Sequence, residues 1–144
     1  MKNHNIILNK DARYVLDRLA KLKKNNKINN LYELDHLESR KEFKKIRNFF
    51  KQKNREEVTW SKNIRVKNFK IRHYRSIKKS PKEILPVMIF FHGGGWVVGD
   101  LDTHDEICRR LVNNSKFDLI SVHYSLAPEN PCPKAFLDAV DTIK

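Results

Sequence analysis

All four glycines of this 144-residue chain lie within seven residues, directly after an apolar run that ends at Phe91. They are Gly93, Gly94, Gly95 and Gly99. Glycine reaches positive φ without steric cost and leaves backbone N–H groups open to a ligand. Several such groups at the end of a buried strand can stabilise a negative charge that develops during a reaction. A tight turn between a strand and a helix, without any ligand, is the alternative interpretation of the same glycines.

Other groups with chemical potential lie close to this turn or downstream of it. Asp100, Asp102 and His104 have residue types that bind metals, but such residues before a helix more often cap it. Cys108 and Cys132 are a single pair without metal-like spacing, so we expect free thiols. The sequence therefore predicts neither a metal site nor a cofactor.

The elements on both sides of the turn predict one βαβ unit. Residues 85–91 form a near-continuous apolar run, typical of a strand covered on both faces in a parallel sheet. A helix is expected over 103–113, with Thr103 as its cap and with inward-facing Ile107, Cys108, Leu111 and Val112. A second parallel strand follows at 118–124, reached by a right-handed crossover, and another helix begins near 135.

Two amphipathic helices and a hairpin are predicted before this unit. The first helix covers 11–24, and the second covers 39–53 with Ser39 and Glu42 as a capping box and a mostly basic outer face. Strands at 58–66 and 69–75 follow, joined by a turn in which Asn68 tolerates the left-handed conformation.

Several motifs in order carry a resemblance to a known family. They are Phe91-His92-Gly93-Gly94-Gly95-Trp96, Gly99-Asp100-Leu101-Asp102-Thr103-His104-Asp105, Cys108-Arg109-Arg110-Leu111 and Tyr124-Ser125-Leu126-Ala127-Pro128-Glu129-Asn130-Pro131. Residues 85–144 resemble the hormone-sensitive-lipase-like branch of the α/β-hydrolases, and residues 1–84 match only in layout. The resemblance implies an α/β fold: a partial α/β-hydrolase sheet, with antiparallel leading strands and then a parallel βαβ unit, preceded by two amphipathic cap helices. It also implies two units, a helical cap-like segment at 1–56 and the amino-terminal part of a hydrolase domain at 57–144.

The same resemblance implies carboxylic ester hydrolysis by a serine, a histidine and an aspartate. The turn Gly93, Gly94 and Gly95 is then expected to form the oxyanion hole, with the N–H groups of Gly94 and Gly95 facing the developing charge. His92 is expected to hold the turn in place and not to act as the catalytic base. The substrate implied is a small ester.

The sequence departs from the family in three respects. Ser125 stands where an arginine is common, and His123 where an aspartate or asparagine is frequent, which leaves His123 either a strand-end residue or a reactive one. No Gly-x-Ser-x-Gly motif occurs among the 144 residues. We therefore expect an amino-terminal fragment of an ester hydrolase, truncated before the nucleophile elbow and inactive alone, with no catalytic residue of the triad in this chain.

The absence of the neighbouring strand has a consequence for partners. The strand at residues 85–91 is expected to be an unpaired, apolar edge, open to self-association or to a complementing chain. No apolar run approaches the roughly 20 residues that span a bilayer, and no signal-peptide pattern begins the chain, so we expect a cytoplasmic protein without a membrane span.

The net charge of +13 is concentrated in one half of the chain. Residues 1–83 carry 25 Lys and Arg against 9 Asp and Glu, whereas residues 84–144 carry 5 against 8. We interpret the basic half mainly as solvated surface, since no nucleic-acid motif accompanies it. The alternative function is a non-catalytic binding module that uses this half to contact a polyanion or a partner protein.

Overall fold

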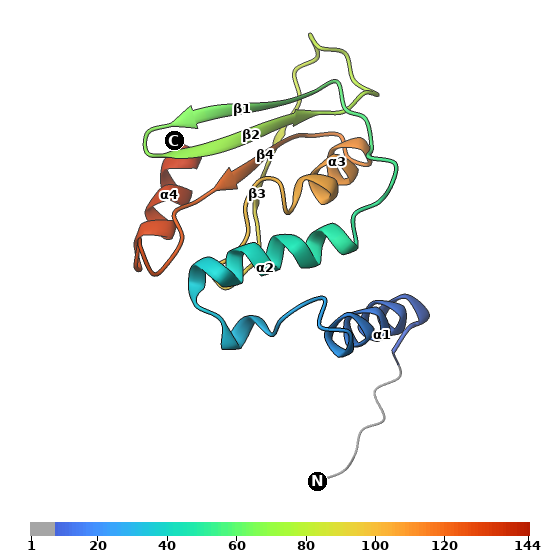
Figure 1. The fold of residues 1–144 in the computed structure, drawn as a ribbon. Helices are drawn as coiled ribbons and strands as arrows, with labels where there is room; N and C mark the ends of the chain where they lie inside the picture. Colours follow the sequence, from blue (N-terminus) through green and yellow to red (C-terminus); the bar gives the residue numbers. More distant parts are fainter. Residues whose placement is uncertain (1–7) are drawn as a thin grey trace, which may run out of the picture.

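The computed structural model describes residues 8–144, which form four α-helices, a short 3-10 helix and one four-stranded sheet (Figure 1). The helices are α1 (Lys10–Lys24), η1 (Leu31–Glu33), α2 (His36–Phe49), α3 (Asp105–Asn113) and α4 (Lys134–Ile143). The strands are β1 (Trp60–Val66), β2 (Phe69–Arg75), β3 (Val87–Phe91) and β4 (Asp118–His123). All the predicted elements are present, with boundaries shifted by a few residues.

The sheet has the strand order β1-β2-β4-β3. β1 pairs antiparallel with β2, β2 antiparallel with β4, and β4 parallel with β3, which confirms the predicted leading hairpin and βαβ unit. Val66 faces Phe69 across the two-residue turn of the hairpin. The residue with positive φ in this turn is Lys67 at 48°, not Asn68 as predicted.

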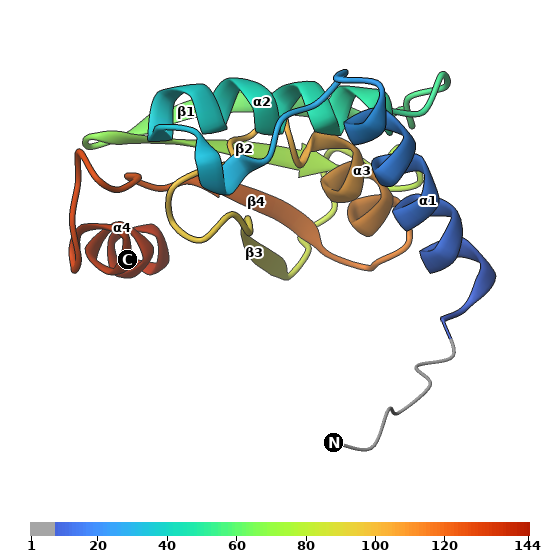
Figure 2. The ribbon, with the colours of Figure 1, turned by 60° about the horizontal axis from the view of Figure 1, so that its bottom comes forward.

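Each face of the sheet carries its own hydrophobic core, because side chains alternate along the strands. One core contains Phe69, Ile71, Val122 and Tyr124, with Ala135 of α4 packed against it. The other contains Tyr74 and Leu119 with Cys108 and Val112 of α3. Helices α3 and α4 therefore cover opposite faces, and α2 lies on the side of α3 (Figure 2).

The start of α2 differs from the predicted capping box. Asp35 is the cap, and its carboxylate accepts two backbone N–H groups of the first turn at 2.8 and 2.9 Å. Ser39 and Glu42 are buried within the helix, where Ser39 donates to Leu31 O (2.9 Å) and Glu42 accepts from Asn29 N (2.8 Å). These two side chains bind the preceding loop, and Asp35 occupies the cap position that was predicted for Ser39.

The start of α3 differs as well. Thr103 does not cap the helix: its hydroxyl accepts from Asp100 N (2.8 Å) and closes the loop before it. His104 occupies the cap position without a side-chain hydrogen bond to the helix. Cys108 and Val112 face the core as predicted, but Ile107 is 41% exposed.

Helix α1 is amphipathic, yet none of its residues is buried. It contacts α2 through Arg18, which donates to Phe49 O (3.1 Å) and lies over the Phe50 ring. Among residues 8–144, no helix has the length and apolar character needed to cross a membrane.

Candidate functional site

The glycine turn lies at the carboxyl ends of the two parallel strands, where open α/β sheets form their ligand crevices. A cleft of about 820 Å³ lies in front of it. Its walls come from the turn itself, from the segment after β4, and from α4. The residues that line it include Gly93, Gly94, Gly95, Tyr124 and Phe136.

The carbonyl groups of the turn are held one after another by hydrogen bonds. The Tyr124 hydroxyl donates to His92 O at 2.6 Å. The His92 ring donates from Nδ1 to Gly93 O at 3.0 Å, which places the imidazole proton on Nδ1. In a trans peptide the N–H points opposite to the C=O, so these bonds also set the directions of the Gly93 and Gly94 N–H groups.

The third carbonyl, Gly94 O, accepts two bonds. Val97 N donates to it at 3.1 Å and Val98 N at 3.0 Å. The Gly95 N–H is the other end of this peptide unit and therefore points away from those donors. Within the part of the chain that the structure describes, the N–H groups of Gly93, Gly94 and Gly95 donate no hydrogen bond. Three N–H groups with fixed directions thus remain available beside a cleft.

Backbone geometry explains why two of these positions are glycine. Gly94 has φ +138°, and a Cβ there would lie 1.9 Å from Val98 O. Gly95 has φ +59° with open space around it, and Trp96 follows in the same left-handed region. Gly93 has neither a positive φ nor a close neighbour, so its conformation does not require glycine.

His92 lies inside the protein, where its ring donates a hydrogen bond to the turn carbonyl Gly93 O. It is 3% exposed and stacks between the Tyr124 ring at 4.4 Å and the His104 ring at 5.2 Å. Burial lowers its pKa below the ordinary value of histidine, so the ring is neutral near pH 7. Its remaining nitrogen, Nε2, is buried and finds no partner among the described residues.

The acidic residues after the turn shape the loop that leads into α3. Asp100 Oδ1 accepts from the N–H groups of Asp102 (3.0 Å) and Thr103 (2.8 Å). Asp102 is exposed and pairs with Arg72 at 2.8 Å. Both carboxylates therefore have structural partners of their own.

The two departures near the end of β4 have different outcomes. Where an arginine was expected, Ser125 donates its backbone N–H to the fully buried Asp138 at 2.8 Å. Lys134, one turn earlier in α4, supplies the positive charge for the same carboxylate. His123 Nδ1 is buried without a partner in the described chain, and burial lowers the pKa of its ring.

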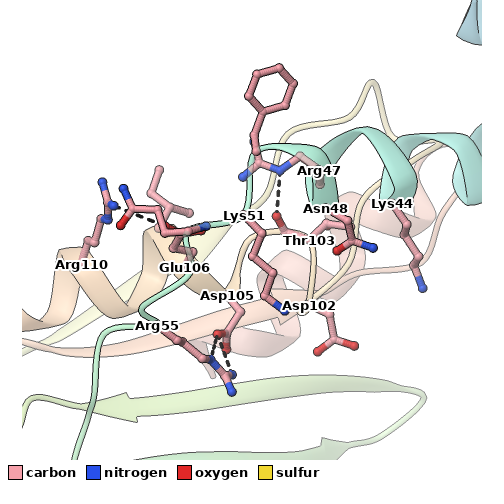
Figure 3. A pocket seen from close by; sticks show the side chains of 13 residues that line it. Lys44, Arg47, Asn48, Lys51, Arg55, Asp102, Thr103, Asp105, Glu106 and Arg110 are labelled. Atoms are coloured by element: carbon pink, nitrogen blue, oxygen red, sulfur yellow. Dashed lines mark hydrogen bonds and ion pairs between the residues drawn. The ribbon is translucent and has the colours of Figure 1, made fainter. Parts of the chain in front are cut away.

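A second cavity of about 640 Å³ lies between α2 and α3 (Figure 3). Its walls carry five cationic side chains, Lys44, Arg47, Lys51, Arg55 and Arg110, and three acidic ones, Asp102, Asp105 and Glu106. Arg55 pairs with Asp105 at 2.7 Å and Arg110 with Glu106 at 3.3 Å. Because four of these charged side chains are paired with one another and the cavity shares no lining residue with the first cleft, the first cleft, which includes the glycine turn, is the stronger candidate.

Comparison with known proteins concerns the fold of the carboxyl-terminal part of the chain. Residues 88–144 match a family described as alpha/beta hydrolase fold. The chain has a partial α/β-hydrolase fold, as the strand order and the hydrolase structures below show.

The similar proteins include esterases. The carboxylic ester hydrolase LipN of Mycobacterium tuberculosis is 47% identical over 68 residues, which cover 47% of this chain and 17% of LipN. Esterase LipI of the same organism is 54% identical over 54 residues, which cover 38% of this chain and 17% of LipI. Among solved structures, the ester hydrolase EH1AB1 from the Lake Arreo metagenome has a TM-score of 0.80 and 31% identity, covering 94% of this chain and 44% of its own. The α/β-hydrolase portion seen here thus corresponds to less than half of each of these proteins.

Proposed function

We propose that this chain supplies the oxyanion-hole part of a carboxylic ester hydrolase that acts on small esters. The observation that carries the proposal is the glycine turn, in which three successive carbonyls are held by protein donors while the N–H groups beside the cleft stay unengaged. Attack on an ester moves negative charge onto the carbonyl oxygen. N–H groups fixed in direction beforehand stabilise that charge without reorganisation, by about 2.7–4 kcal/mol for each donor.

In this proposal Gly94 and Gly95 donate to the oxyanion, Gly93 supplies the carbonyl that His92 binds, and His92 holds the turn. The nucleophile comes from outside residues 1–144, since no Gly-x-Ser-x-Gly motif occurs within them, and the family resemblance implies that the acid and the base follow it. The 144 residues alone are therefore inactive. The open edge of β3 is where a further strand, from a complementing chain or from a second copy, would pair.

We also propose the division into a cap-like segment at 1–56 and a hydrolase part at 57–144. The first segment includes residues 1–7, which lie outside the described range. The position of α2 supports this division. The helix lies along the loops that border the cleft and contacts them at Val97 and Ala127.

The test is a chimera of LipN in which residues 88–144 of this chain replace the aligned LipN segment. We expect it to hydrolyse short-chain p-nitrophenyl esters and to be labelled by a fluorophosphonate on a serine from LipN. Gly94→Ala should lower its kcat by about 100-fold or more, because the Cβ would displace the peptide that carries an oxyanion donor.

The matched control is Lys116→Ala, a change at an exposed lysine. A folded Gly94→Ala chimera with undiminished kcat would contradict the oxyanion role. Hydrolysis by the 144-residue chain itself, with a labelled serine in it, would contradict the absence of a nucleophile.

A further inference from the structure

Helix α2 contacts the loop after the glycine turn with a regular spacing. Its basic residues at positions i, i+4 and i+7 meet loop residues three apart. The pairs are Arg40 with Val97 O (2.8 Å), Lys44 with Asp100 (2.7 Å) and Arg47 with Thr103 O (3.0 Å). Figures 1 and 3 show α2 lying beside this part of the chain. These three residues of the basic face are therefore engaged within the protein.

Arg40 makes the most extensive contacts of the three. Its Nε donates to Val97 O, and its Nη2 donates to Ala127 O at 2.9 Å. Its two terminal nitrogens also bind the Glu129 carboxylate, each at 2.7 Å. Because Ala127 N donates to Trp96 O at 2.9 Å, Arg40 joins two loops that already meet beside the cleft.

A chain of two peptide units connects Arg40 to the glycine turn. Val97 O and Val98 N–H belong to one peptide unit, and Arg40 holds its carbonyl end. The N–H end donates to Gly94 O at 3.0 Å. Gly94 O in turn belongs to the peptide unit that carries the Gly95 N–H. Since peptide units are planar, fixing the first one fixes the donor that orients the second.

We propose that Arg40 is a positioning residue that orients the Gly95 N–H toward the cleft by holding the Val97–Val98 peptide. The role in catalysis rests on the proposed function, whereas the role in holding the turn does not. Lysine cannot replace Arg40, because a single ammonium lacks the planar set of donors that reaches two carbonyls and a carboxylate together.

The test is amide hydrogen exchange measured by NMR on the full 144-residue chain. In Arg40→Ala, the Val98 N–H should exchange about ten-fold faster or more, since charge-assisted hydrogen bonds of this kind contribute enough to protect it to that extent. Amides in the β2–β4 pairing should change much less. The matched control is Lys41→Ala, an exposed residue of the same helix.

Two further variants keep the test decisive if Arg40→Ala does not fold. Arg40→Lys should lose most of the protection at Val98, whereas Glu129→Gln should keep it, because the bond from Arg40 to Val97 O remains. Unchanged exchange at Val98 in Arg40→Lys, or an equal acceleration at all amides, would overturn the proposal. An inactive LipN chimera would instead refute the proposed function and leave the exchange result standing.

Discussion

Gly99 shows how tightly single residues are constrained around the turn. It has φ +104°, and a Cβ there would lie 2.5 Å from His92 Nδ1 and 2.8 Å from Gly93 O. Gly99→Ala should therefore destabilise the fold by about 1–3 kcal/mol, because it combines backbone strain with a clash. The measurement is the free energy of unfolding in urea.

Gly93→Ala provides the control for this prediction. It adds the same methyl group within the same loop, but nothing lies within 4 Å of that position and its φ is not positive. It should change the free energy of unfolding by no more than about 0.5 kcal/mol. Equal losses of unfolding free energy in the two variants would show that the close approach to His92 is not the reason why position 99 requires glycine.

His123 should make the stability of the protein depend on pH near neutrality. Burial lowers its folded-state pKa below the ordinary 6.5, so the unfolded chain takes up a proton first. The stabilisation is present above pH 6.5 and is lost as pH falls through the folded pKa. Between about pH 7.5 and pH 5, the thermal midpoint of the natural chain should fall more steeply than that of His123→Asn. Parallel curves for the two proteins would contradict this prediction.

The sequence indicated the glycines of the turn and His92, but not the contact that Arg40 makes with the loop after the turn. The glycines and His92 have side-chain types that indicate their role. Arg40 gives no such signal, because two of its three partners are backbone carbonyls and any residue type offers those. The interpretation of the basic half as solvated surface is too simple at Arg40, which binds two loops, whereas Lys44 and Arg47 make contacts with the loop after the turn and stay exposed.

At the scale of elements, α3 is joined to β2 and to the segment before β1 by one buried carboxylate. Asp105 accepts hydrogen bonds from Arg55 (2.7 Å), Arg72 (3.1 Å), Arg109 (2.7 Å) and the Tyr74 hydroxyl (3.0 Å). Asp105→Asn leaves three guanidinium groups without their shared anion. We expect a loss of about 3–5 kcal/mol in the free energy of unfolding.

Asp102→Asn is the matched control, because Asp102 also pairs with Arg72 but has a side chain that is 77% exposed. Exposed ion pairs contribute at most about 1 kcal/mol, so the free energy of unfolding of this variant should remain close to that of the natural chain. If urea denaturation gave similar losses for both, burial would not be what makes Asp105 important.

The elements themselves were largely predictable, because apolar periodicity determines which segments are helices and strands. Their boundaries were less so, since they depend on competition between neighbouring caps. Asp35 displaced Ser39 at the start of α2, and Thr103 closed a loop with Asp100 when it was expected to begin α3. Both outcomes rest on hydrogen bonds between residues two or three apart, so several nearby side chains compete for each helix start and periodicity does not select among them.

At the scale of the whole molecule, the two edges of the sheet differ in chemistry. β1 carries Lys62 and Arg65, whereas β3 has the sequence Val-Met-Ile-Phe-Phe without a charge. Val87 is 52% exposed and Phe91 40% exposed on that second edge. Uncharged open edges pair with other strands, so the chain should associate as its concentration rises, through β3.

Val87→Lys should reduce this association in sedimentation experiments, because it places a charge on the open edge. Ile64→Lys makes the same change at a residue of β1 that is 44% exposed, and should have little effect. A chain that stays monomeric at every concentration, or equal effects of both variants, would contradict a role for the β3 edge.

The donors that fix the glycine turn also have a bearing on when it can form. All of them lie between Arg40 and Tyr124, and the loop that Arg40 joins ends at Glu129. During synthesis on the ribosome, every contact that shapes the turn is available once Glu129 has emerged from the exit tunnel. The glycine turn can thus reach its final shape before any later segment takes part.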